Sequence, residues 1–266
     1  MVVIDAHGHA WTDEDEYAWM GDVTPSGVEK IVYSVDNYLE DLDTLKADKA
    51  ALVATPIHGR GSPYTMDCLE AHPDTFYGVV LLKYGADNIA TRVDRAFAHD
   101  NVIGVRLTGD EIADANPALW DALAAHDGQA QFLTDPESLA EVERLAGEHP
   151  DVQFVVDHLG MASGVGSHQP DEQPYATMSD LAEHSNVAVK LTHTPSAGPY
   201  PFADTHKHVR YLFEEFGSDR LLWGSDYIYH FKKTSLIDTK RFIAELEFLS
   251  TGDERRILGR NMDDLL

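Results

Sequence analysis

The sequence predicts a single (β/α)8 barrel that spans all 266 residues. Eight short, mostly apolar runs recur along the chain, as is typical of parallel strands that are buried on both faces. Helical patterns fill the gaps between these runs, and this alternation implies a parallel sheet with right-handed crossovers. The chain length suits a barrel that forms one domain.

The predicted strands cover residues 2–4, 51–54, 78–82, 102–107, 130–133, 152–156, 187–191 and 220–223. An open, doubly wound sheet is the alternative, but no Gly-x-Gly-x-x-Gly motif follows the first strand. We therefore expect a closed barrel in which the last strand lies beside the first.

Amphipathic segments between the strands predict the helices. The pair Asp135-Pro136 caps one helix, in which leucine and valine recur at three-residue spacing. Pro117 opens a second helix, Gly217 ends a third, and a fourth apolar stripe covers residues 237–249. These stripes are expected to face the core.

The composition excludes several classes of partner. The chain has 46 acidic and 20 basic residues and a net charge of −26, which repels nucleic acid and anionic membranes. No apolar run is long enough to span a membrane and no export signal is recognisable, so a cytoplasmic protein is expected. Acidity spread along the chain favours a salt-adapted, halophilic protein over an ordinary acidic enzyme.

A single cysteine, Cys68, excludes an internal disulfide and a thiolate zinc cluster. We expect it to be buried and inert. The sequence leaves the oligomeric state open, a homo-oligomer included.

Candidate site residues follow the predicted strands, because catalytic side chains of such barrels lie at the carboxyl ends of strands. The first strand leads into Asp5-Ala6-His7-Gly8-His9. Two residues apart on an extended segment, His7 and His9 point to the same side. The alternative is a pair of polar loop histidines.

Two further candidates follow later strands. His158 follows the sixth strand, where it is either a site residue or a hydrogen-bonded core histidine. Asp226 follows the eighth, where a carboxylate must be paired, coordinated or shifted in pKa, unless it caps a helix. Closure of the barrel brings Asp226 to His7 and His9, and two imidazoles with a carboxylate suit a divalent cation such as zinc.

Four segments resemble the amidohydrolase-related family, which includes lactonases and non-oxidative decarboxylases. They are Asp5-Ala6-His7-Gly8-His9, Asp157-His158-Leu159-Gly160, Leu222-Trp223-Gly224-Ser225-Asp226-Tyr227 and Gly259-Arg260-Asn261-Met262-Asp263-Asp264-Leu265-Leu266. The resemblance implies that His7, His9 and Asp226 surround a metal or hydrolytic centre. It also implies that His158 is a catalytic or ligand imidazole.

The fifth strand departs from the pattern of metal-dependent members, which often carry a histidine at its end. Here the segment reads Gln129-Ala130-Gln131-Phe132-Leu133-Thr134-Asp135. This resembles the lactonase branch, of which some members work without metal. We expect a divalent metal, zinc or else manganese, held by His7, His9, His158 and Asp226, and the metal-free alternative stays open.

Basic and imidazole side chains at other strand ends predict a small anionic substrate, since positive charge there would hold a carboxylate. The candidates for substrate binding are His58, Arg60, Lys83, Arg106, His193 and His230. The alternative is that some of these cations, and Lys190 above all, pair with buried carboxylates. Two long loops, 161–174 and 194–204, are expected to cover the substrate.

These observations predict a hydrolase of a small lactone or related ester. Asp226 would act as general base on a water molecule, bound to metal if metal is present. The metal or His158 would polarise the carbonyl, and His158 could protonate the leaving oxygen. Two rivals remain: a metal-dependent decarboxylase on the same barrel, and a barrel that binds a ligand without catalysis.

Overall fold

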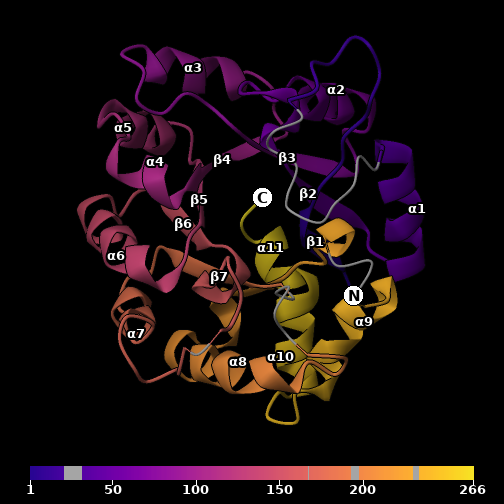
Figure 1. Cartoon of the computed structure of the whole chain (residues 1–266), viewed down its shortest axis with the longest axis vertical. Helices are drawn as coiled ribbons and strands as arrows, with labels where there is room; N and C mark the ends of the chain where they lie inside the picture. The colour runs from indigo at the N-terminus through magenta and orange to yellow at the C-terminus, as the bar shows by residue number, and fades with distance from the viewer. Residues whose placement is uncertain (21–31, 167, 193–197, 230–233) are drawn as a thin grey trace.

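The computed structural model describes residues 1–20, 32–166, 168–192, 198–229 and 234–266. Eight strands form one sheet in chain order, and each is parallel to the next. They are β1 (Ile4–Gly8), β2 (Lys49–Val53), β3 (Phe76–Val80), β4 (Val102–Thr108), β5 (Gln129–Leu133), β6 (Gln153–Val156), β7 (Val187–Leu191) and β8 (Leu221–Trp223). Helices surround the sheet (Figure 1), so the (β/α)8 barrel is confirmed.

The barrel closes where the chain leaves β8 and meets β1. The backbone N–H of Asp226 donates to the carbonyl of His7 at 2.9 Å. Ser225 donates to the Asp5 carboxylate through its backbone N–H at 2.8 Å and through its hydroxyl at 2.5 Å. Gly224 permits this approach, because a Cβ atom there would lie 2.6 Å from the Cβ of His7. The strand that carries the histidines is thereby tied to the segment that carries Asp226.

The first strand differs most from its prediction. The apolar run ends at Ile4, but β1 continues to Gly8, so His7 lies within the strand. Asp5 can be buried there because its carboxylate accepts hydrogen bonds from Ser225, from the His7 backbone and from the Tyr38 hydroxyl. A buried carboxylate with several donors continues a strand that hydrophobicity alone would end.

The helices are α1 (Val35–Leu45), α2 (Pro63–Ala71), α3 (Ile89–Ala96), α4 (Gly109–Ala113), α5 (Ala118–Ala124), α6 (Leu139–Glu148), α7 (Thr177–Ala182), α8 (Ala203–Phe216), α9 (Leu236–Arg241), α10 (Thr251–Arg255) and α11 (Asn261–Asp263). Their apolar faces pack on the outside of the sheet and form the larger core. The predicted apolar stripes on α5, α6 and α8 contribute to this core. The fourth stripe differs from its prediction, because Ile237 on α9 is exposed and the buried Phe242, Leu246 and Leu249 follow the end of that helix. No described helix is long and apolar enough to cross a membrane.

A second, smaller core fills the inside of the barrel. Ile4, Ala51 and Leu222 belong to it, and Met262 of α11 joins them. Gln129 donates to the backbone carbonyl of Leu265 at 3.1 Å. The C-terminal segment therefore closes the end of the barrel where the strands begin (Figure 1), and the opposite end is left for a site.

Candidate active site

A cavity of about 340 Å³ lies at the carboxyl ends of the strands. The residues that line it lie at or just after the ends of different strands, as expected for a site on this fold. They are His9, Ala54, Thr55, Pro56, Arg60, Leu81, Arg106, Thr108, Glu111, Leu133, His158, Ala162, Asp226 and Tyr229. Ala162 comes from the loop 161–174, so part of the predicted cover reaches the cavity.

Two cavity residues have a strained backbone. His158 has a φ of 51° and Asp226 a φ of 45°, in the left-handed region that residues with a side chain rarely adopt. Each lies just beyond the end of its strand, β6 or β8, and both side chains line the cavity at the mouth of the barrel. Such strain is typical of functional sites, where the surrounding structure compensates its cost.

His9 and Asp226 face each other inside the cavity. The Nδ1 atom of His9 lies 2.6 Å from the carbonyl oxygen of Val53, which can only accept, so Nδ1 carries a proton. The other ring nitrogen, Nε2, lies 3.3 Å from Oδ1 of Asp226. Nε2 of His9 and Oδ1 of Asp226 are therefore close enough for a proton to lie between them.

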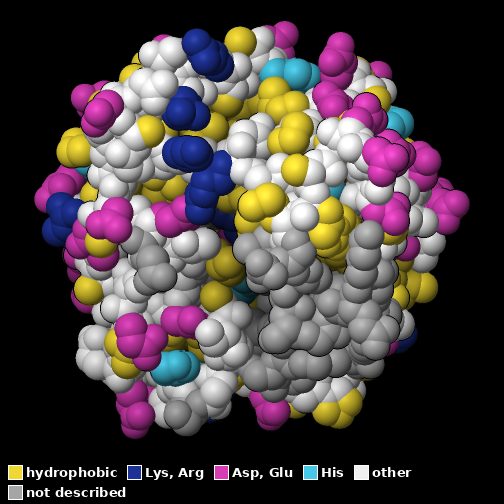
Figure 2. Space-filling view, turned by 45° about the horizontal axis from the view of Figure 1, so that its top comes forward, with side chains coloured by type: hydrophobic (Ala, Val, Ile, Leu, Met, Phe, Trp, Pro, Cys, Tyr) yellow, Lys and Arg dark blue, Asp and Glu magenta, His cyan; other side chains and the backbone are white. Residues whose placement is uncertain are grey.

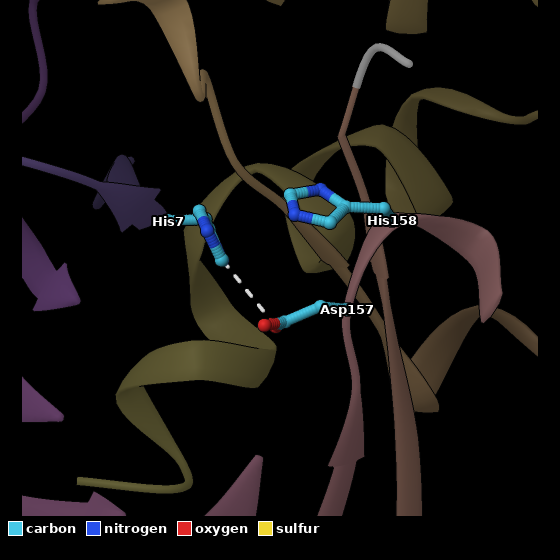
Figure 3. A group of neighbouring side chains, drawn as sticks. All are labelled: His7, Asp157 and His158. Carbon is cyan, nitrogen blue, oxygen red and sulfur yellow. Dashed lines mark ion pairs between the residues drawn. The ribbon is translucent and has the colours of Figure 1, made fainter. Parts of the chain in front are cut away.

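His7 lies deeper, among charged side chains. It is fully buried, and its Nδ1 lies 3.1 Å from Nζ of Lys190 and 3.3 Å from Oδ1 of Asp157. Figure 3 shows His7 and Asp157 pointing toward each other from β1 and the end of β6. Arg106 completes the group, since its Nε donates to Oδ2 of Asp157 at 2.9 Å. We call His7, Arg106, Asp157 and Lys190 the cation cluster.

The cation cluster shifts the pKa values of its members. Burial would raise the pKa of the Asp157 carboxyl, but Lys190, His7 and Arg106 together hold it well below its ordinary value. Burial lowers the pKa of His7 well below its ordinary value, against the opposing charge of Asp157. Burial also lowers the pKa of Lys190, again opposed by Asp157. Asp157 is therefore ionised and His7 neutral near pH 7.

His158 connects the cation cluster to the cavity. Its Nε2 lies 3.3 Å from Nη2 of Arg106, and its Nδ1 lies 2.5 Å from the hydroxyl oxygen of Thr192. The same Nδ1 lies 3.7 Å from Oδ2 of Asp226. The imidazole thus stands between a guanidinium group and a carboxylate, and both reach the cavity.

The structure separates the residues predicted to bind substrate. Arg60 and Arg106 line the cavity, and each already has a carboxylate partner, Glu111 and Asp157 respectively. Lys83 is exposed and does not line the cavity. In Figure 2, Lys and Arg side chains form a row that leads to the hollow in the middle of this face.

His58 is also absent from the cavity lining. It accepts from the Thr12 backbone through Nε2, and its Nδ1 donates to the carbonyl of Ala18. These bonds give His58 a structural role in holding two loops together. The remaining two candidates, His193 and His230, lie outside the described residues.

Several cavity or cluster residues were not among the predicted site residues. Glu111 and Tyr229 line the cavity, Asp157 belongs to the cation cluster, and Gln131 contacts Lys190 of that cluster. Asp157 is adjacent to His158 in sequence, so the same strand end could have suggested it. Gln131 alternates with the apolar residues of β5, and a polar residue inside a buried strand is the signal that could have found it.

The donors could suit a metal, but the neighbouring charges oppose one. The groups His7, Asp157, His158 and His7, His9, Asp226 each bring ligand atoms within 4.8 Å of one another, and both need His7. Yet Lys190 lies 3.1 Å from Nδ1 of His7, and Nη2 of Arg106 lies 3.5 Å from Nε2. A divalent cation on either nitrogen would meet a like charge in a buried site. The cluster as it stands does not fit a metal at His7.

Comparison with known proteins identifies the family. The model of the amidohydrolase family matches residues 4–265, which is nearly the whole chain. The chain belongs to this family. Its match to an L-fucono-1,5-lactonase from Burkholderia ambifaria is 36% identical over 137 residues and covers 47% of this chain and 45% of that protein. The chain therefore matches less than half the length of that relative.

Solved structures share the fold. An amidohydrolase from Burkholderia multivorans with bound zinc has a TM-score of 0.83 and 17% identity, covering 100% of this chain and 99% of that one. A protein from Acinetobacter baumannii assigned as a 2-pyrone-4,6-dicarboxylic acid hydrolase, with citric acid bound, has a TM-score of 0.78 and 17% identity over the same shares. At this identity the likeness concerns the barrel alone.

Proposed function

We propose that the protein hydrolyses a small lactone without a metal ion, with Asp226 as general base. The observation that carries the proposal is the cavity in which Asp226 faces His158 and Arg106 across the barrel mouth. The partial match to an L-fucono-1,5-lactonase supports a cyclic ester as the substrate. A carboxylate opposite a fixed positive charge is the arrangement that addition of water to a carbonyl requires.

The mechanism follows from these positions. Asp226 takes a proton from a water molecule, whose oxygen attacks the lactone carbonyl carbon. The protonated carboxyl is held by Nε2 of His9, which lies 3.3 Å from Oδ1. Arg106 and His158 stabilise the negative charge that develops on the carbonyl oxygen. The ring C–O bond then breaks, Asp226 returns its proton to the leaving oxygen, and the product is a hydroxy acid.

The proposal gives Arg106 the role of stabilising the developing negative charge, which the sequence led us to expect of a metal. A zinc ion held by His7, His9 and Asp226 would lower the pKa of a bound water. Arg106 already brings positive charge beside His7 and His158, within 3.5 Å and 3.3 Å of their Nε2 atoms. The zinc or manganese expected from the sequence stays a prediction, and the geometry favours the metal-free alternative.

We further propose that the substrate itself is uncharged, although the sequence suggested an anion. Among the described residues that line the cavity, Arg60 and Arg106 each have a carboxylate partner. Thr55, Thr108 and Glu111 offer polar groups that suit the hydroxyls of a sugar lactone. The positive charge would then serve the developing oxyanion and the carboxylate of the product.

A substrate panel tests the proposal. The purified protein is assayed by proton release on L-fucono-1,5-lactone and related neutral sugar lactones, and on 2-pyrone-4,6-dicarboxylate as a charged lactone. Carbon dioxide release is measured on aromatic acids, to test the decarboxylase rival. We expect the highest kcat/KM on a neutral sugar lactone. Carbon dioxide release without lactone turnover would contradict the proposal, and preference for the dicarboxylate would contradict the uncharged substrate.

A further inference from the structure

Lys190 is the one cation of the cluster that neither lines the cavity nor reaches the surface. It lies on β7, inside the barrel, and its side chain is 0% exposed. The proposed mechanism gives it no role. A lysine buried this completely needs a partner for each of its N–H groups.

Three acceptors surround its ammonium group. Nζ lies 2.5 Å from Oε1 of Gln131, 3.1 Å from Nδ1 of His7 and 3.1 Å from Oδ1 of Asp157. An ammonium group has three N–H donors and no acceptor. Gln131 and His7 can accept hydrogen bonds from Lys190, whereas Asp157 meets it as an ion pair, and Oδ1 of Asp157 has no hydrogen-bond partner.

A chain of hydrogen bonds fixes the direction of the contact with Gln131. The backbone carbonyl of Leu265 can only accept, so the amide nitrogen of Gln129 donates to it at 3.1 Å. The oxygen of Gln129 then accepts from the amide nitrogen of Gln131 at 2.9 Å. The side-chain oxygen of Gln131 therefore faces Lys190, and it accepts a hydrogen bond from the ammonium group.

The contact with His7 fixes the tautomer of that ring. If Nδ1 accepts from Lys190, the proton of the neutral imidazole is on Nε2. The other tautomer would let Nε2 accept from Arg106, but at the longer distance of 3.5 Å. It would also point an N–H group at an ammonium 3.1 Å away. In that tautomer the N–H group would also have Oδ1 of Asp157 as an acceptor at 3.3 Å. The contact of Nδ1 with Lys190, at 3.1 Å, is the shortest of the three and favours the proton on Nε2.

We infer that Lys190 occupies the place of a metal ion: its ammonium group takes the Nδ1 lone pair of His7 and contacts Asp157, and it holds the His7 proton on Nε2. Lys190 is thus a positioning residue. It removes His7 from both groups of candidate metal ligands and leaves only His9 and Asp226 in the second group. Zinc sites in proteins use three or four protein ligands. The inference rests on the proposed site but needs no lactone turnover.

Zinc binding tests the inference through the Lys190→Met variant. Calorimetric titration with zinc at fixed pH should show weak binding to the wild type and binding at least about tenfold tighter to the variant, because one charge is removed and one lone pair is freed. The matched control is Lys49→Met, which removes the same charge from β2 beside Asp263. Equal zinc affinity of wild type and Lys190→Met would overturn the inference, as would an equal gain in the control.

A second measurement needs no variant of Lys190, in case its loss prevents folding. The ¹⁵N shifts of His7 in histidine-labelled wild type, assigned by comparison with His7→Gln, report which ring nitrogen carries the proton. We expect the proton on Nε2. A proton on Nδ1 overturns the inference whatever the activity, whereas absence of lactone turnover with the expected tautomer would contradict the proposed function alone.

Discussion

His7 and His9 are two residues apart, yet their surroundings differ completely. His7 is fully buried, lies outside the cavity lining and is held by Lys190 and Asp157. His9 lines the cavity, with one nitrogen fixed by Val53 and the other facing Asp226. Spacing along a strand sets the side on which both rings point. The charges that reach them from other strands set their chemistry.

The site therefore has two halves. In the proposed mechanism, the cation cluster around His7 supplies fixed positive charge, and the pair of His9 and Asp226 supplies a base. A metal centre would need both halves to bind one ion. The following predictions test the contribution of each half, from the largest expected effect to the smallest.

Asp226→Asn should remove the base and lower kcat at least about 10³-fold, because an amide cannot take a proton from water. The fold should remain intact, as judged by circular dichroism. Asp121→Asn, an exposed position on α5, is the control and should keep full activity. Turnover retained in Asp226→Asn would move the base to another residue.

Arg106→Met should lower kcat/KM about 10²-fold through loss of the oxyanion partner. Arg106→Lys keeps the charge but not the two-sided contact with Asp157 and His158, and it should recover only part of the activity. Steady-state kinetics on the best lactone check both variants. An unchanged kcat/KM in Arg106→Met would remove the cation cluster from the chemistry.

Asp157→Asn should destabilise the fold by about 3–5 kcal/mol at pH 7, because it leaves Arg106 and Lys190 without their shared carboxylate. The pKa of this carboxyl is lower in the folded protein than in the unfolded chain. Its stabilisation is therefore fully present above the unfolded pKa of about 4, and it is lost as the pH falls through the folded pKa.

Urea unfolding of wild type and Asp157→Asn between pH 7 and pH 3 checks this prediction. The difference in unfolding free energy should stay constant down to about pH 4 and narrow only below it. A difference that already narrows between pH 7 and pH 5 would show that Asp157 is not held ionised by the cluster.

Lys83→Ala should have the smallest effect, because this side chain is exposed and does not line the cavity. We expect kcat/KM within about twofold of wild type at moderate salt, since an exposed charge is screened. A large loss, measured on a charged and a neutral lactone in parallel, would restore Lys83 as a substrate-binding residue.

Much of the fold could be predicted because the signals are local. The apolar runs and helical stripes follow from burial on one or both faces of each element, and barrel closure follows from the strand order. The end of β1 could not be predicted in the same way. Asp5 can be buried in the strand because side chains distant in the sequence, Tyr38 and Ser225, donate to its carboxylate together with the backbone of His7.

The sequence predicted which side chains form the site, but not which charged groups lie beside them. The sequence brings His7, His9, His158 and Asp226 to one end of the barrel, and the structure brings the same side chains together. That Lys190 pairs with a buried carboxylate was one of two alternatives, and the structure shows this pairing. What the sequence could not reveal is that Lys190 and Arg106 also contact His7, because those distances depend on the relative placement of three strands, β1, β4 and β7.

The most direct test of the metal-free account is lactone turnover after removal of metal. The protein is dialysed against a strong chelator, its metal content is measured, and kcat/KM is determined before and after addition of zinc. We predict full activity with well under one metal ion per chain and no gain on addition of zinc. Activity that disappears with the metal and returns with zinc would contradict the account.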